Sequence, residues 1–245
     1  MAKNIQLIIS YKGTRYAGWQ FQKNALSVEA CLLEAIKAVT GEKVKLYGSG
    51  RTDAGVHAIG QAANFMTDST IPPERFALAL NTKLPRDIRI MKSRAVADDF
   101  HSRYNAAGKI YVYQIYNAPI ESPLYWDYTW HVRENLDLDL MKQAAGNFLG
   151  WHDFKGFMST GSCVKTTERR IDEINIEKDG PLITLNFRGN GFLYNMVRII
   201  TGTLVEVGEK RIDVKSVPDI IKSGDRERAG ITAPAQGLFL KKVIY

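Results

Sequence analysis

The sequence predicts an α+β protein built from two ferredoxin-like halves that form one continuous antiparallel sheet with helices on one face. Segments with strand and helix patterns follow one another in the order β-α-β-β-α-β over residues 4–96. A similar order of segments is expected after residue 108. With 245 residues, the chain is long enough to build a substantial core.

The first predicted strand and helix rest on periodicity and capping. Apolar residues alternate over residues 4–11, which is typical of a strand with one buried face. Ser27 is a favourable N-cap for a helix over residues 28–39, and Gly41 is suited to end that helix.

The rest of the first half is predicted from short apolar runs and from proline. Strands are expected at residues 44–47, 56–66 and 88–96. The proline pair at residues 72–73 favours the start of a helix, which Pro85 ends.

The second half is expected to repeat this order, although no repeat of sequence accompanies it. Asp179-Gly180 is a strong hairpin signal between two of its strands. We expect boundaries of 1–105 for the N-terminal half and 106–245 for the C-terminal half. Strands are predicted at 109–116, 171–177, 182–187 and 237–244, and helices at 138–149, 193–207 and 214–223.

Composition narrows the function classes. The net charge of +7, from 33 Lys and Arg against 26 Asp and Glu, favours a polyanionic partner. The sequence has no run of about eighteen apolar residues and no signal-peptide pattern, so we expect a cytoplasmic protein without a membrane span. Cys31 and Cys163 lie far apart and the four histidines are scattered, which predicts no metal site. Cys31 is expected to be a small core residue.

The string GSGRTDAGVHA at residues 48–58 is the strongest candidate for chemistry. Its glycines permit tight turns and close approach of another backbone, and Asp53 supplies an acid. An ordinary loop with an Asx-turn at Asp53 and a phosphate cradle are the other interpretations. The P-loop and GxGxxG patterns are both missing, which disfavours the cradle.

This string, followed by Gln61-Ala62, resembles the signature of the TruA family of tRNA pseudouridine synthases. Further stretches that resemble the family occur in the family's order, so the resemblance covers essentially the whole chain. They lie at residues 11–20, 100–103, 111–113, 195–208 and 233–245.

The resemblance implies an isomerase that converts uridine to pseudouridine at positions 38, 39 and 40 in the anticodon stem-loop of tRNA. It implies a homodimer that grips tRNA across both subunits. It also implies that no metal, nucleotide or organic cofactor takes part.

The resemblance implies three catalytic residues in a cleft between the halves. Asp53 matches the nucleophile, and Arg198 matches an arginine that pairs with it. Tyr111 matches a tyrosine that stacks on the target uracil and is implicated in removing the proton at carbon five. Without the resemblance, Tyr111 would be interpreted as a packed sheet residue and Arg198 as a solvated arginine.

Contacts to RNA are expected from Tyr111 and from three cations, Arg51, Arg103 and Lys109. The family often has an arginine pair just before the central tyrosine, whereas this chain has Gly108-Lys109-Ile110. Lys109 keeps one of the two charges. Trp19 is interpreted either as a stacking surface for RNA or as a packed loop residue.

Three other functions remain open from the sequence. The first is a pseudouridine synthase with a different RNA target. The second is a non-catalytic RNA-binding module on a ferredoxin-like sheet, which would not need the acid at Asp53. The third is a small-molecule enzyme on the same fold, which the basic charge disfavours.

Overall fold

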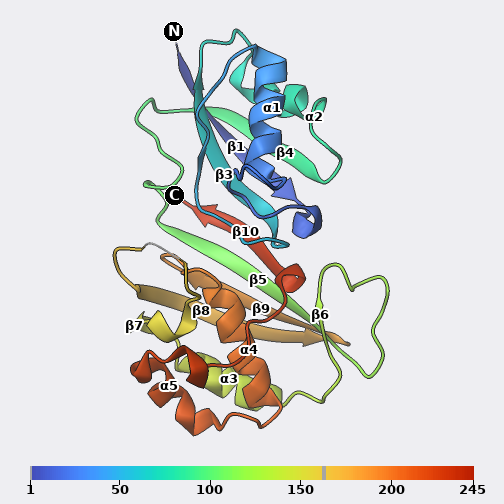
Figure 1. The fold of residues 1–245 in the computed structure, drawn as a ribbon, viewed down its shortest axis with the longest axis vertical. Helices are drawn as coiled ribbons and strands as arrows, with labels where there is room; N and C mark the ends of the chain where they lie inside the picture. The colour runs from blue at the N-terminus through green and yellow to red at the C-terminus, as the bar shows by residue number, and fades with distance from the viewer. Residues whose placement is uncertain (1, 162–163) are drawn as a thin grey trace. The chain divides into compact units, whose positions relative to one another are not determined.

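The computed structural model describes residues 2–161 and 164–245, and this part of the chain is α+β, with five α-helices and ten strands. Its contacts divide it into two compact units (Figure 1). The first comprises Met1–Ala107 and Phe239–Tyr245, and the second is Gly108–Leu238. None of the helices in the described residues is both long and apolar enough to cross a membrane.

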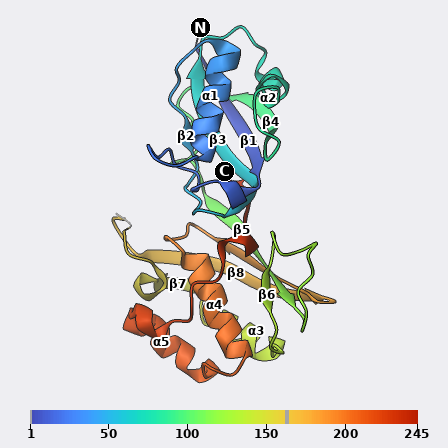
Figure 2. The same cartoon turned by 45° about the vertical axis from the view of Figure 1, so that its right-hand side comes forward.

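The first unit is a sheet with two helices on one face (Figures 1 and 2). β1 pairs antiparallel with β3 and β4, and β2 pairs antiparallel with β3, which gives the order β4-β1-β3-β2. The elements are β1 (Lys3–Tyr11), α1 (Val28–Thr40), β2 (Tyr47–Gly48), β3 (His57–Thr67), α2 (Phe76–Asn81) and β4 (Ile88–Val96).

The capping signals of α1 are confirmed. The Ser27 side chain accepts a hydrogen bond from the Ala30 N–H at 3.3 Å, which satisfies one of the free donors at the helix start. Gly41 ends the helix with φ 78°. Cys31 on this helix is half-buried rather than fully in the core, and Cys163 lies outside the described residues.

Two elements of the first unit are shorter than predicted. The strand predicted over 44–47 is reduced to β2, which meets β3 at only two positions. The helix predicted from the proline pair splits into a 3-10 turn, Pro73–Arg75, and the short α2. Asn81 ends α2 because its side chain bonds both the N–H and the C=O of Ile90 on β4, at 2.8 and 2.9 Å.

The second unit is also a sheet with its helices on one face (Figures 1 and 2). Its strand order is β5-β9-β8-β7, all antiparallel, and β6 pairs parallel with β5. The elements are β5 (Gly108–Asn117), β6 (Trp130–Val132), α3 (Leu138–Gly146), β7 (Gly150–Asp153), β8 (Glu168–Asp179), β9 (Leu182–Gly189), α4 (Met196–Gly208) and α5 (Val217–Ser223).

The hairpin predicted at Asp179-Gly180 is confirmed, since β8 and β9 flank it and Gly180 has φ 55°. The short strands β6 and β7 were not predicted, because three or four residues carry too little periodicity. The last strand, β10 (Leu238–Ile244), differs from the expected halves. It pairs parallel with β3, which groups residues 239–245 with the first unit.

Close packing of a loop against α4 fixes this helix in the second unit. A Cβ atom built on Gly202 would lie 1.8 Å from the backbone oxygen of Ile231, so the loop touches the helix backbone directly. The Ala233 N–H also donates to the Arg198 carbonyl at 3.2 Å. The helix turn that carries Arg198 is therefore held from outside the helix.

We predict that Gly202→Ala destabilises the protein even though alanine is the better helix former. The gain in helix propensity is about 1 kcal/mol, whereas the clash with Ile231 should lower the free energy of unfolding by about 2 kcal/mol net. Gly146→Ala is the matched control, because no atom lies within 4 Å of its Cβ position in α3. It should raise stability by about 0.5 kcal/mol. Urea unfolding measures both, and equal responses would contradict the packing argument.

Candidate active site

The loop that carries Asp53 connects β2 to β3 in the first unit. Its turn closes where the Asp53 carbonyl accepts the Val56 N–H at 3.1 Å. The Gly55 N–H donates to the Tyr16 carbonyl at 3.2 Å, so the turn is tied to the loop after β1. Asp53 itself is half-buried.

The residues after β1 clamp this loop from a second side. The Trp19 N–H donates to the Thr52 carbonyl at 3.1 Å. Gly18 has φ 91°, and a Cβ built there would lie 2.5 Å from the same carbonyl oxygen, so the position requires glycine. The Trp19 ring is buried against Gly48. Of its two interpretations, the structure supports loop packing.

Buried hydroxyl and amide groups hold the loop from beneath. The Tyr11 and Thr52 hydroxyls share a hydrogen bond of 2.7 Å. Gln61 on β3 accepts from the Ser49 hydroxyl at 2.6 Å and donates to the Gly50 carbonyl at 3.0 Å. The segment before Asp53 is therefore fixed by both neighbouring strands.

Burial is the main reason that the pKa of the Tyr11 hydroxyl is raised. Burial raises the pKa of Tyr11 far above its ordinary value, and the negative charge of Asp53 adds to the rise. Hydrogen bonds with Thr52 and Gln61 lower that pKa but do not cancel the rise. Asp53 thus lies near a hydroxyl pair that carries no charge at neutral pH.

His57 has a structural role at the start of β3. Its ring is buried, and Nδ1 accepts the Gly13 N–H at 2.9 Å, which places the proton of a neutral ring on Nε2. The ring stacks on Phe239 of β10 with centroids 4.8 Å apart. Among the described residues, no group of three or more His, Cys, Asp or Glu side chains is arranged to hold a metal ion.

In the second unit, two tyrosines on the same face of β5 have different surroundings. Tyr111 is buried and meets Phe192 edge to face, with centroids 5.2 Å apart. The Tyr113 hydroxyl donates to the Pro234 carbonyl at 2.7 Å. Burial raises the pKa of Tyr113, and the positive charge of Arg198 opposes that rise. Tyr113 therefore ties the loop before β10 to the sheet.

The guanidinium of Arg198 is oriented by two acceptors. Nε donates to the Ala233 carbonyl at 2.6 Å, and Nη1 donates to the Asn195 side-chain oxygen at 2.8 Å. Asn195 itself donates to the Ser159 hydroxyl at 2.9 Å. Arg198 is half-buried, so it is a positioned cation rather than a fully solvated one.

The predicted site residues fall in both units. Asp53 lies in the first, and Tyr111 and Arg198 lie in the second. The three predicted RNA-binding cations are Arg51 and Arg103, which are exposed, and Lys109, which is half-buried opposite Gly189.

The sequence patterns did not predict the supporting roles of Tyr11, Thr52, Gln61 and His57. Each of them stands inside or beside the segments quoted for the resemblance. Their position next to the Asp53 turn was therefore the available signal, but their contacts join distant parts of the chain.

A family model described as tRNA pseudouridine synthase matches residues 7–105 and 144–245. These ranges include Asp53 and Arg198, whereas Tyr111 lies between them. Among solved structures, a chain from a Cbf5-Nop10-Gar1 complex is 12% identical with a TM-score of 0.37, over 96% of this chain and 57% of that one. A likeness this weak establishes neither a shared fold nor a shared function.

Curated relatives align along the whole chain. A tRNA pseudouridine synthase A from Acetivibrio thermocellus is 52% identical over 99% of this chain and 100% of its own length. A protein of the same name from Thermoanaerobacter sp. is 48% identical with the same coverage, and tRNA pseudouridine synthase A 2 from Clostridium tetani is 48% identical over the full length of both chains. On this evidence, the chain belongs to the tRNA pseudouridine synthase family.

Proposed function

We propose that this protein is an enzyme that isomerises uridine to pseudouridine at positions 38, 39 and 40 in the anticodon stem-loop of tRNA. The observation that carries the proposal is the rigid turn that presents Asp53, clamped by Gly18-Trp19 and by the Tyr11–Thr52 hydroxyl pair. The names of the full-length relatives support the same activity.

The proposal includes the architecture of the site. The halves, 1–105 and 106–245, are ferredoxin-like and share one sheet, which is antiparallel apart from the β10–β3 and β5–β6 pairs, and the active site lies in the cleft between them. The order β4-β1-β3-β2 in the first unit supports the ferredoxin-like assignment. The pairing of β10 with β3 supports the exchange of a strand between the halves.

Asp53 is the proposed nucleophile. Its carboxylate forms a bond to the substrate, and the bond between ribose and ring nitrogen breaks. The base then turns and rejoins the ribose through carbon five, and the bond to Asp53 breaks again, which frees the carboxylate. The proton at carbon five leaves and the ring nitrogen gains one, so the reaction is an isomerisation without oxidant or hydrolysis. It needs no metal or organic cofactor.

Arg198 and Tyr111 are the proposed partners of Asp53. An arginine beside the carboxylate favours its charged form against the desolvation that a bound base imposes, and it can pair in two-pronged geometry. Tyr111 gives the flipped uracil a stacking surface and takes part in removing the proton from carbon five.

The proposed partners are tRNA and a second copy of the chain. Arg51, Arg103 and Lys109 are assigned to contacts with the RNA backbone, which carries no base identity but fixes the position of the stem-loop. The homodimer follows from the family resemblance.

Asp53→Asn tests the nucleophile with little change in volume. The variant should release tritium from unmodified tRNA labelled at carbon five of uridine at least about 10³-fold more slowly than the wild type. No cofactor is added to the assay. Binding without release by the wild type, with every tRNA tested, would overturn the proposed activity in favour of a binding module.

Arg198→Lys tests the paired geometry. Lysine keeps the charge but loses the planar fork, so the single-turnover rate should fall about 10- to 100-fold. Arg133→Lys, at an exposed arginine in the same unit, is the control and should leave the rate unchanged. An Arg198→Lys enzyme as fast as the wild type would remove the pairing role.

Tyr11→Phe tests the support beneath Asp53. It leaves the Thr52 hydroxyl without its buried partner, so the free energy of unfolding should fall by about 1–2 kcal/mol. The single-turnover rate should fall while the tRNA dissociation constant stays constant. Thr52→Ser keeps a hydroxyl at this position and should retain most of the rate. A loss of affinity with an unchanged rate would argue that Tyr11 does not position Asp53.

A further inference from the structure

A hollow of about 220 Å³ in the first unit lies between the end of β1 and the start of β4. Tyr11 and Lys12 line it from β1 and the residue that follows. Arg86, Asp87 and Arg89 line it from the turn before β4 and from the strand itself. The volume exceeds that of several water molecules, so a phosphate group fits.

The charged groups of the hollow are mainly cationic, with Lys12, Arg86 and Arg89 against Asp87. Lys12 and Arg89 are half-buried, while Arg86 is exposed. Cations gathered around an open hollow favour an anionic ligand.

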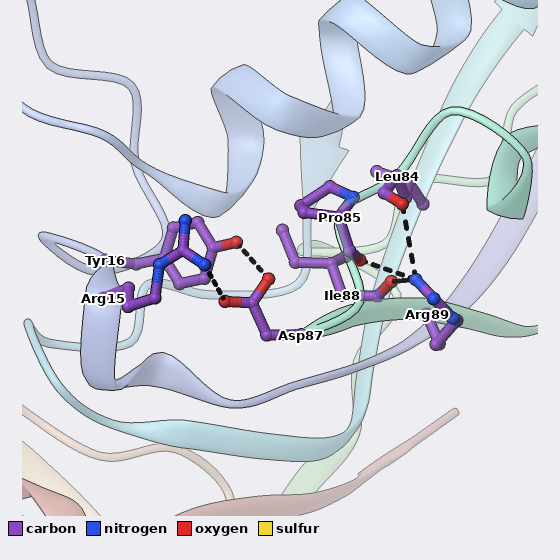
Figure 3. Close-up of polar contacts among 7 residues, drawn as sticks. All are labelled: Arg15, Tyr16, Leu84, Pro85, Asp87, Ile88 and Arg89. Atoms are coloured by element: carbon purple, nitrogen blue, oxygen red, sulfur yellow. Dashed lines mark hydrogen bonds and ion pairs between the residues drawn. The ribbon is translucent and has the colours of Figure 1, made fainter.

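The one carboxylate is already engaged on its other side. Figure 3 shows the Asp87 carboxylate turned toward Tyr16 and Arg15 and away from Arg89. The Tyr16 hydroxyl donates to it at 2.7 Å, and Arg15 Nη1 lies 3.5 Å from its second oxygen. Its charge is therefore offset by groups outside the lining, which reduces its repulsion of an anion.

Arg89 is held in place before any ligand arrives. Its Nη1 donates to the Pro85 and Ile88 carbonyls, both at 2.6 Å, as Figure 3 shows. Among the described residues, Nε and Nη2 make no hydrogen bond, so this edge of the guanidinium keeps its donors. A positioned arginine loses less conformational entropy when it binds a phosphate.

The hollow is connected to the Asp53 loop through Tyr11. The Tyr11 residue lines the hollow, and its hydroxyl bonds Thr52, the neighbour of Asp53. The Lys12 N–H also donates to the Asp87 carbonyl at 2.9 Å, which fixes the two walls to each other. An anion in the hollow would therefore lie at a fixed offset from the candidate nucleophile.

We infer that this hollow binds a backbone phosphate of the tRNA, with Lys12, Arg86 and Arg89 as its ligands. The inference rests on the proposed function, which supplies the RNA. A phosphate held there sets the register of the strand relative to Asp53 and reads no base.

Equilibrium binding of an unmodified tRNA transcript at about 50–200 mM KCl tests the site. Arg86→Ala and Lys12→Ala should each weaken binding several-fold and reduce the slope of log affinity against log salt by about 1. The double variant should reduce the slope by about 2. Lys83→Ala is the matched control, because Lys83 is an exposed cation in the same connection between α2 and β4 and does not line the hollow.

Equal slopes for Arg86→Ala and Lys83→Ala would overturn the inference, because a general charge effect would then explain both. Unchanged slopes in Arg86→Ala and Lys12→Ala would overturn it as well. Thermal melting shows whether a variant is unfolded. If one of the two single variants is unfolded, the salt slope of the other one tests the inference. Tritium release by the wild type is measured on the same samples. If the wild type releases tritium and the salt slopes of Arg86→Ala and Lys83→Ala are equal, only the phosphate site in the hollow is rejected. If the wild type releases no tritium, the proposed function is rejected.

Discussion

The geometry of the candidate active site depends on how Thr52 is held. Its carbonyl accepts the Trp19 N–H at a place where Gly18 leaves no room for a side chain. Its hydroxyl bonds the buried Tyr11 hydroxyl at 2.7 Å. Backbone and side chain of Thr52 are thus fixed by two different segments, and the next residue is Asp53. The backbone position of Asp53 is therefore set in part by its neighbour Thr52.

The sequence predicted the structural features that depend on interactions between residues close together in the chain. Ser27 and Gly180 act through their own backbone neighbourhood, so their effects could be foreseen. The end of α2 could not, because Asn81 bonds Ile90 on a strand that comes later in the chain. The pairing of β10 with β3 joins residues about 180 positions apart and leaves no local pattern.

The same distinction applies to the site. The string around Asp53 is contiguous, so its resemblance to a family signature made it a candidate directly. Tyr111 and Tyr113 share one face of β5 and have the same periodicity, and only their surroundings separate them. The Tyr113 hydroxyl donates a hydrogen bond to the Pro234 carbonyl, which is 121 residues away in the chain. No pattern within the strand distinguishes a packing tyrosine from one that contacts a base.

Under the proposed function, the reaction draws on charged groups from both units. Tyr11 and Thr52 fix Asp53 but bring no positive charge, and a uracil bound over the carboxylate would remove water from it. Desolvation alone disfavours the charged form of a carboxylate and would weaken the nucleophile. A cation must offset this cost, and it must be held in place so that pairing costs little entropy. Under the proposed function Arg198 of the second unit supplies this charge, and Ala233 and Asn195 orient its guanidinium. Under the proposed function, the first unit supplies a positioned carboxylate and the second supplies the charge that keeps it ionised, so neither unit alone would catalyse the reaction.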